Sequence, residues 1–571
     1  MKRKLISIVM CVLLAFGVVA TASACKKAED PNTIKIFLPF EVVSGYTSYN
    51  ELSVYQELER RTGVKVEYTH GVYNDIQQMW TGDYQNYDVM FISDVQVGAG
   101  YPGGIEKGIA DGVIWDLTEY IEKYAPDYLK TIDESYDSVK KFTKTDSGKM
   151  AGIYNIPISE QGPWYGFVVR EDWLRLYEEA TGVIEKGGEL KDLVTYDDWE
   201  KFLTYVKDNI HGGKKAPLFL YYTGTDMVGT LNAGYQVSSG LYLKNGNTVT
   251  YGATQPEYKQ YLDKMRDWYQ KGLIDANFYT NNEGTESQMP QMPAMDNFAY
   301  DQAALQEALG KGDMAAAMQI MANATYNPAQ YAAFPMIYTY IHTYEDLMKN
   351  YETFYQAQGK EVYNLRPVAA PKLNASDELH IRYTEKSSAY AVVTNRVKTE
   401  EKVKAIVEWF NYLFTDKGSL LMNYGIENDT FTMVDGKPQF TEKITANKEG
   451  QQGLSFSDAI NKYCSLNFAF KYDWERELQV VNEEEKSAMT EVWNCDNSYV
   501  MPTVTLTEAE GRVAEAYELN INKFKDEFTV NYIISKNAPS FEDFVSTLKN
   551  TYKVDELVKV YAAAYQRYIA R

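Results

Sequence analysis

Histidine and cysteine are scarce in this chain of 571 residues, which contains four of each. The histidines are His70, His211, His342 and His380. They lie far apart, and neither an H-E-x-x-H motif nor a cysteine at the spacing of a zinc site accompanies them. No EF-hand loop and no G-x-S-x-G motif occurs either. The sequence therefore predicts no metal site and no cofactor, with a calcium site built from scattered carboxylates and carbonyl groups as the open alternative.

One glycine motif matches a dinucleotide fingerprint only in outline. Residues 98–103 read Gly-Ala-Gly-Tyr-Pro-Gly after a predicted strand. Pro102 and the glycines beside it oppose the helix that such a motif has to begin. We expect a loop here rather than a cofactor site.

The chain also lacks blocks of basic residues. It has 57 Lys and Arg against 79 Asp and Glu, which gives a formal charge of −22. Loss of the first 24 residues, which include three basic and no acidic side chains, makes the charge −25. Nucleic-acid binding and electrostatic attachment to anionic lipid are therefore not expected.

After the N-terminus, no apolar run approaches the ~18 residues that a membrane span needs. The N-terminus itself has three basic residues, an apolar run at 5–20, and Ala22-Ser23-Ala24 before Cys25. This order is typical of a secretory signal peptide, and Cys25 stands where a bacterial lipobox has its lipidated cysteine. We predict a signal peptide at 1–24, lipidation of Cys25, a tether at 25–32, and an extracytoplasmic, lipid-anchored protein. An ordinary cleaved signal with an incidental cysteine is the alternative.

Two other cysteines remain in the mature chain. In an oxidising compartment Cys464 and Cys495 could form one disulfide. Two buried free thiols are the equally weighted alternative, because free cysteine packs as a small hydrophobic residue.

Aromatic residues are abundant, with 48 Tyr, 9 Trp and 23 Phe. Tyrosine at this density is found in proteins that stack rings on sugars, although most of these side chains must fill the core and its rim.

Hydrophobic periodicity indicates an α/β protein of more than one domain, since single cores rarely exceed about 300 residues. Strands are predicted at 34–38, 64–68 and 87–92, with helices between them, which is the pattern of a parallel sheet. Pro157 and Gly162-Pro163 indicate a hinge before a second lobe that begins with a strand at 164–170. The stretch 506–571 is predicted to be helical.

Several segments resemble the extracellular solute-binding lipoproteins of ABC importers, in particular the aldouronate- or oligosaccharide-transport type. They are the lipobox at Cys25 and the residues at 87–91, 121–126, 169–174, 268–275, 409–418 and 423–429. The chain departs from the pattern at Asn428 and Asp429, and at 534–537 in the helical C-terminal region.

The resemblance implies a two-lobed, type II periplasmic-binding-protein-like fold with several chain crossings at its hinge. Lobe one is expected at 33–155 with 388–440, and lobe two at 156–387 with 441–571. The resemblance further implies a monomer that captures an oligosaccharide and delivers it to ABC permease subunits, in contact with the membrane through its lipid only.

Position along the chain suggests which residues contact the ligand. They are Phe40, Glu41, Tyr46, Asp94, Trp164, Tyr165, Tyr424 and Glu427. Each could instead pack the core or cap a helix. Trp493 and Tyr499 are expected to pack structurally. Arg170 is the only basic residue that we place near the site, so a neutral ligand is favoured over an acidic one.

Transport rather than catalysis is the expected function. Two alternatives remain open. An extracellular glycan hydrolase or lyase would need two suitably placed carboxylates, which 79 acidic residues cannot exclude. A ligand-sensing lipoprotein without a permease is the other alternative.

Overall fold

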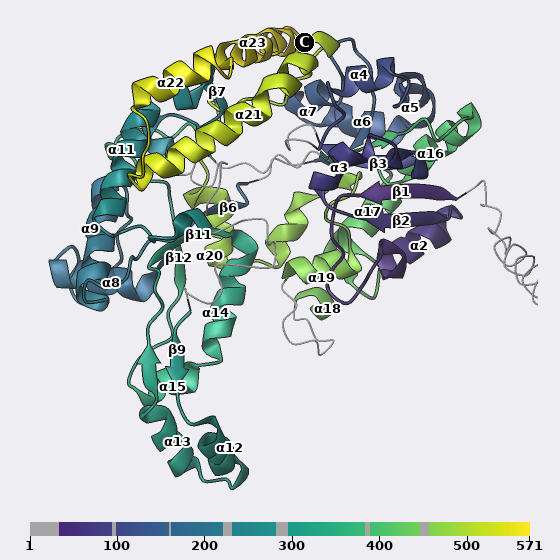
Figure 1. Cartoon of the computed structure of the whole chain (residues 1–571). Helices are drawn as coiled ribbons and strands as arrows, with labels where there is room; N and C mark the ends of the chain where they lie inside the picture. Colours follow the sequence, from purple (N-terminus) through teal and green to yellow (C-terminus); the bar gives the residue numbers. More distant parts are fainter. Residues whose placement is uncertain are drawn as a thin grey trace, which may run out of the picture.

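The computed structural model describes residues 33–93, 99–158, 162–220, 231–280, 295–382, 389–445 and 456–571. The predicted signal peptide, Cys25, the tether and Asp94 lie outside these residues. Figure 1 shows two α/β lobes side by side, lobe one built around the sheet that contains β1 and lobe two around the sheet that contains β6. The predicted fold class is confirmed, including the helical C-terminal region. None of the helices in the described ranges has the length and apolarity of a membrane span.

Lobe one is built on a five-stranded sheet of order β2-β1-β3-β13-β4. Its strands are β1 (Ile34–Leu38), β2 (Val66–His70), β3 (Val89–Ser93), β4 (Ile153–Tyr154) and β13 (Ala389–Val393). β1 is parallel to β2 and β3, whereas β13 is antiparallel to both β3 and β4. A strand from far along the chain thus completes the sheet.

Alternating side chains of β3 enter different cores because successive residues of a strand point to opposite faces. Val89 and Phe91 belong to the cluster on one face, and Met90 and Ile92 to the cluster on the other. The helices of the lobe are α2 (Ser53–Thr62), α3 (Tyr73–Met79), α4 (Ile105–Ala110), α5 (Thr118–Tyr124), α6 (Pro126–Glu134), α7 (Asp137–Phe142), α16 (Glu400–Tyr412) and α17 (Asp416–Tyr424). With both faces covered, only the edge of the sheet is left for a ligand.

Lobe two has a three-stranded antiparallel sheet in which β6 (Tyr165–Arg170) lies between β11 (Ala333–Ile337) and β12 (Leu365–Val368). Its other elements are α8 (Glu171–Thr181), α9 (Tyr196–Tyr205), β7 (Leu241–Lys244), β8 (Thr248–Tyr251), α11 (Pro256–Gln270), α14 (Ile341–Lys349), α20 (Glu483–Ser487), α21 (Glu508–Ile533), α22 (Phe541–Asn550) and α23 (Val554–Ala570). The last three helices form an arch over the top of Figure 1 and pack into the lobe two core.

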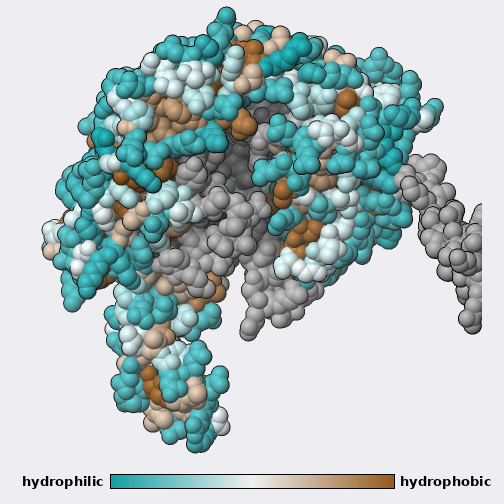
Figure 2. Space-filling view, viewed as in Figure 1, coloured by the Kyte–Doolittle hydropathy of each residue, from teal (hydrophilic) through white to brown (hydrophobic). Residues whose placement is uncertain are grey.

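An arm projects from lobe two and stands clear of the rest of the molecule (Figures 1 and 2). It contains β9 (Asn297–Ala299), α12 (Gln302–Gly310), α13 (Met314–Ala322), β10 (Thr325–Asn327) and α15 (Glu352–Ala357). The arm has a small core of its own around Phe298, Leu305 and Phe354. It is therefore a subdomain rather than a loop.

The chain passes between the lobes after β4, between residues 382 and 389, and again after β16 (Lys471–Tyr472), which pairs in parallel with β5 (Ile156–Pro157). The segment before β16 packs on lobe one: Tyr55 Oη lies 3.0 Å from Ser465 Oγ, and the ring of Phe468 stacks on Phe410 at 6.0 Å. It includes β14 (Phe431–Val434), β15 (Lys437–Phe440), α18 (Glu442–Thr445) and α19 (Phe456–Tyr463). We place the last crossing after β16, later than the predicted one at 440/441, because these aromatic side chains are part of the lobe one core.

Candidate functional site

The carboxyl ends of the lobe one strands form the edge of the sheet that faces lobe two. β1, β2 and β3 run in one direction, and β4 shares it because β3 and β4 are both antiparallel to β13. The chain leaves for lobe two directly after β4. In open α/β sheets, ligands bind outside the carboxyl ends of the strands. Residues that follow β1 and β2 are therefore candidates for a binding site.

Phe40 is one of the aromatic side chains at this edge. It is half-buried, and its ring lies edge-on to Tyr73 at 5.7 Å and to Phe91 at 6.2 Å. The backbone oxygen of Phe40 lies 2.9 Å from Nδ1 of His70, the last residue of β2. Burial lowers the pKa of His70, so the ring is neutral at pH 7. This wall of lobe one is aromatic and uncharged.

The loop after β1 carries two more predicted residues. Glu41 is exposed, and Tyr46 is half-buried with Lys462 Nζ 5.9 Å from its ring centroid. Tyr46 also packs against the lobe one core. The structure thus brings Phe40, Glu41 and Tyr46 together on one loop, as their positions after the strand predict.

Trp164 and Tyr338 lie at the facing edge of lobe two. β6 begins at Tyr165 and β11 ends opposite it at Ile337, so the residues just outside both strands are neighbours. Tyr338 N donates to Trp164 O at 3.0 Å, and the two rings meet edge-on at 5.5 Å. The indole Nε1 of Trp164 is buried and has no hydrogen-bond partner among the described residues. A buried donor without a partner costs about 1–3 kcal/mol, which an acceptor from a ligand would offset.

A buried polar cluster ties this wall to the hinge. Glu477 Oε2 accepts from Tyr338 Oη at 3.1 Å, and its Oε1 accepts from Tyr472 Oη at 2.9 Å. Arg476, fully buried, donates to the same carboxylate at 3.1 Å and to the backbone oxygen of Asn423 at 3.1 Å. Since Tyr338 belongs to lobe two and Asn423 to lobe one, the cluster connects the lobes where the last crossing occurs.

Sequence reasoning missed both Tyr338 and Glu477. Tyr338 directly follows β11, but Pro335 interrupts the strand pattern of β11 in the sequence, so the position of Tyr338 at a strand end is not evident. Proline is tolerated there since β11 is an edge strand. The role of Glu477 between the lobes gives no local signal, because Tyr338, its partner in lobe two, is 139 positions away in the chain.

Tyr424 and Glu427 lie apart from the facing edges, at the turn before β14. The hydroxyl of Tyr424 donates to Asp473 Oδ2 at 2.8 Å, and its ring packs against Phe440 at 5.1 Å, so the side chain is buried. Glu427 is exposed.

At the hinge, Tyr165 is buried at the start of β6. Of the predicted residues, Phe40, Glu41, Tyr46, Trp164 and Tyr165 thus lie on elements of the facing edges.

Arg170 is bound by two aspartates and is not available to a ligand. Its guanidinium is fully buried, donates to Asp172 at 2.6 Å and to Asp296 at 2.5 Å, and lies between the rings of Trp173 and Tyr363 at 3.8 and 3.7 Å. Burial would raise the pKa of Asp296, but the attraction of Arg170 holds it below its ordinary value. Arg170 is a structural residue at the base of the arm.

Cys464 and Cys495 are free thiols, so the possible disulfide between them does not form. Cys464 is buried in a cluster with Ile444 and Ile460 on the lobe one side of the last crossing. Cys495 follows Trp493, which packs on β6 of lobe two and donates from Nε1 to Phe167 O at 3.0 Å. The two cysteines therefore belong to different lobes.

One histidine has the neighbours of a hydrolase triad but the wrong geometry. His380 Nδ1 lies 2.5 Å from Asp496 Oδ2 and 3.5 Å from Ser498 Oγ. A serine nucleophile and its carboxylate must contact opposite ring nitrogens, whereas here both contact the same one. Within the described ranges, no group of three or more His, Cys, Asp or Glu side chains is arranged to hold a metal ion.

Neither a protein-family model nor a curated protein sequence matches this chain. Several solved structures do match it. The alginate-binding protein AlgQ2 superposes with a TM-score of 0.66 at 17% identity, over 94% of this chain and 99% of that one. FusA, an ABC-transporter substrate-binding protein of S. pneumoniae solved with kestose, superposes with a TM-score of 0.64 at 16% identity. The match covers 94% of this chain and 99% of FusA. An HMO-binding, ABC-transporter-associated solute-binding protein of Bifidobacterium longum infantis superposes with a TM-score of 0.60 at 15% identity, over 94% of this chain and 99% of that one.

The chain therefore has, over nearly its whole length, the fold of ABC-transporter solute-binding proteins. The fold that the sequence motifs imply is confirmed.

Proposed function

We propose that this protein is an extracytoplasmic solute-binding protein that captures an oligosaccharide between its two lobes and delivers it to an ABC importer. The observation that carries the proposal is the pair of facing edges, with the half-buried Phe40 on lobe one and the half-buried Trp164, packed against the fully buried Tyr338, on lobe two. Structures of the same fold are described as binding alginate, kestose and HMO.

Aromatic rings and single hydrogen-bond donors suit this task. The C–H faces of a sugar ring stack on an aromatic side chain, and its hydroxyl groups accept hydrogen bonds from groups such as the indole Nε1 of Trp164. A ligand that contacts both walls favours the orientation in which they are close, and a permease can recognise that orientation. The three crossings give the chain a hinge for this movement.

A neutral oligosaccharide fits better than an acidic one. An acidic sugar would be bound by arginine or lysine at the site. Arg170 is buried with two aspartates, and Arg476 with Glu477 and backbone carbonyl groups. The aromatic side chains of the two walls are themselves uncharged. Beside them, Glu41 is acidic and repels a carboxylate, whereas Lys462 Nζ lies against the Tyr46 ring, 5.9 Å from its centroid.

Attachment to the membrane through lipid on Cys25, after removal of 1–24, completes the proposal. A short tether at 25–32 would hold the lobes near the permease without a protein segment in the bilayer. We propose action as a monomer, because one chain contains both walls.

Isothermal titration calorimetry of the mature chain, with Cys25→Ser, against neutral and uronic-acid oligosaccharides tests the proposal. Saturable binding of an intact neutral sugar is expected, with affinity reduced at least tenfold in Trp164→Ala and Phe40→Ala. Trp115→Ala is the matched control, because Trp115 is also half-buried but donates to Val397 O within lobe one. Release of shorter products would instead establish a hydrolase or lyase. If Trp164→Ala, Phe40→Ala and Trp115→Ala lose the same amount of affinity, the proposed binding site is refuted.

A further inference from the structure

The arch of C-terminal helices touches lobe one at a place separate from the chain crossings. The end of α23 and the beginning of α21 reach α4 and the loop 143–149 between α7 and β4 (Figure 1). Helices α21 and α23 pack in lobe two, whereas the loop is joined to lobe one through the hydrogen bond from Leu117 N to Met150 O. The contact is therefore between lobes and is not covalent.

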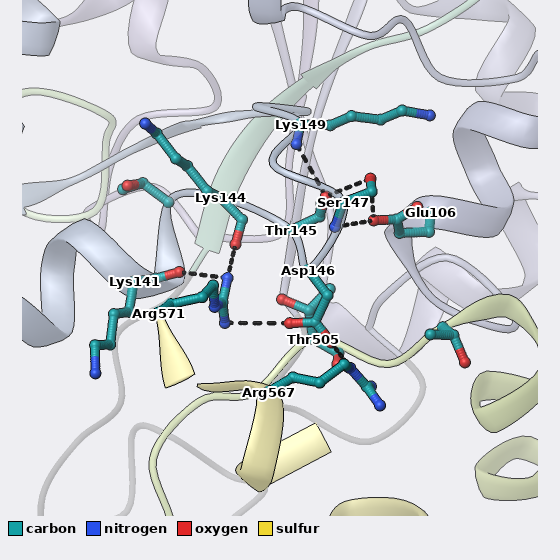
Figure 3. Close-up of polar contacts among 12 residues, drawn as sticks. Glu106, Lys141, Lys144, Thr145, Asp146, Ser147, Lys149, Thr505, Arg567 and Arg571 are labelled. Atoms are coloured by element: carbon teal, nitrogen blue, oxygen red, sulfur yellow. Dashed lines mark hydrogen bonds and ion pairs between the residues drawn. The ribbon is translucent and has the colours of Figure 1, made fainter. Parts of the chain in front are cut away.

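Asp146 is the centre of the ionic part of this contact. Figure 3 shows Arg567 and Arg571 of the α23 end directed at its carboxylate. Arg567 Nε bonds Asp146 Oδ2, and Arg571 Nη2 lies 3.3 Å from Oδ1. Arg571 Nη1 also donates to the backbone oxygens of Lys141 at 3.2 Å and Lys144 at 2.7 Å. The Asp146 side chain is only 7% exposed, so water screens these pairs less than it screens surface pairs.

Both partners are held in place before they meet. On lobe one, Gly148 N donates to Thr145 O at 2.9 Å, and Ser147 Oγ donates to Glu106 Oε1 at 2.6 Å, which fixes the turn that carries Asp146. On lobe two, Glu510 accepts from Arg567 Nη1 at 2.8 Å and Nη2 at 2.5 Å. Little side-chain entropy remains to be lost when the lobes meet, which favours a strong pair.

A close backbone contact lies beside the ion pairs. Gly511, in the first turn of α21, approaches Gly103 so closely that a Cβ on Gly511 would lie 2.1 Å from Gly103 O. Gly103 has φ of +83°, which favours glycine. The loop 99–103 thus supplies a contact surface for lobe two.

We propose that these contacts form an inter-lobe latch, defined by Asp146, Gly103, Gly511, Arg567 and Arg571. Rotation of the lobes about the crossings must separate or shear the latch, because its two halves move with different lobes. The latch therefore favours the lobe orientation described here and sets the equilibrium between orientations. Only its effect on ligand affinity rests on the proposed binding function.

Distances between spin labels on the two lobes, measured without ligand, test the latch. Lys130→Cys and Glu189→Cys place labels on exposed positions of lobe one and lobe two. Cys495→Ser removes the half-buried thiol, and burial raises the pKa of Cys464 to about 12, which keeps that thiol unreactive. The latch variants are Asp146→Asn, which removes charge, and Gly511→Ala, which inserts a methyl group.

Both variants are expected to move the distance distribution in the same direction, with about a fivefold change in the ratio of orientations for Asp146→Asn. Asp197→Asn is the control, since it breaks an exposed pair with Lys201 inside one helix of lobe two. An unchanged distribution in Asp146→Asn overturns the proposal even if Gly511→Ala shifts, because a steric clash alone can separate two surfaces. Ligand affinity should change by the same factor as the population. Absence of sugar binding would refute the proposed function and leave the label distances as an independent result.

Discussion

Replacement of Asp296 by asparagine should loosen the arm of lobe two without affecting ligand binding. The carboxylate accepts five hydrogen bonds, two from Arg170 at 2.5 and 3.2 Å and one each from Tyr326 at 2.7 Å, Tyr355 at 2.6 Å and Ala329 N at 2.7 Å. These donors come from the main sheet of lobe two, from β10, from α15 and from the segment before β11. One side chain thus connects the arm to the body of the lobe.

The magnitude follows from the charge and from the number of donors. Asp296 and Arg170 are both fully buried, and removal of one partner of such a pair costs roughly 3–5 kcal/mol. Asparagine keeps the shape and can still accept from Tyr355 or Ala329, and Arg170 retains Asp172. We therefore expect a loss of about 3 kcal/mol in the free energy of unfolding.

Chemical denaturation and hydrogen exchange followed by mass spectrometry measure the two effects. Exchange should rise in 297–327 and 352–357 and remain unchanged in lobe one. Asp192→Asn is the matched control, because it removes an exposed pair with Arg366 in the same lobe and should cost less than 0.5 kcal/mol or so. Equal stability of Asp296→Asn and Asp192→Asn would refute the reasoning. A selective loss of acidic-sugar binding would mean that Arg170 serves a ligand after all.

Two further predictions concern single buried sites. Burial raises the pKa of Glu345 to about 7, so the folded state holds a proton that the unfolded state has lost, and this group makes stability fall as pH rises from about 4.5 to 7. Glu345→Gln, which can still accept from Leu365 N, should therefore be more stable than the parent above pH 7, by about 3 kcal/mol, and similar to it at pH 4.5. Denaturation midpoints that differ equally at both pH values would contradict this. Gly166→Ala would place a Cβ 2.4 Å from the Trp493 ring, so we expect a loss of about 1–3 kcal/mol and altered tryptophan fluorescence, whereas an unchanged unfolding curve would show that the indole moves freely.

Local patterns predicted the elements of the sheet but not the partners of buried polar groups. The strands expected at 34–38, 64–68 and 87–92 are observed as β1, β2 and β3 with shifts of two residues or fewer. Their alternation and the helices between them depend only on neighbouring residues. The pairing of Arg170 with Asp296 spans 126 positions and is settled by tertiary packing, so no local pattern could show that Arg170 is unavailable to a ligand.

Boundaries between lobes were harder to predict for the same reason. The residues at 465–472 are rich in aromatic side chains that could pack on either lobe, and only tertiary contacts, such as those of Phe468 with Phe410 and of Ser465 with Tyr55, assign them to lobe one. The break between α12 and α13 is a local feature of the sequence. Gly312 has φ of +70°, and Asp313 accepts from Ala316 N, so one helix ends and α13 begins within three residues.

The place of β13 in the sheet of lobe one has a consequence for the order of folding. β13 lies between β3 and β4, yet about 230 residues separate β4 from β13, and they include all three strands of the lobe two sheet. Closing a loop of that length has an entropic cost of about 5 kcal/mol. A chain synthesised from its N-terminus must keep the edges of β3 and β4 unpaired until residue 389 has emerged. Any fragment that ends earlier exposes both edges, so a holding factor that shields β-strand edges would suppress aggregation of the nascent chain.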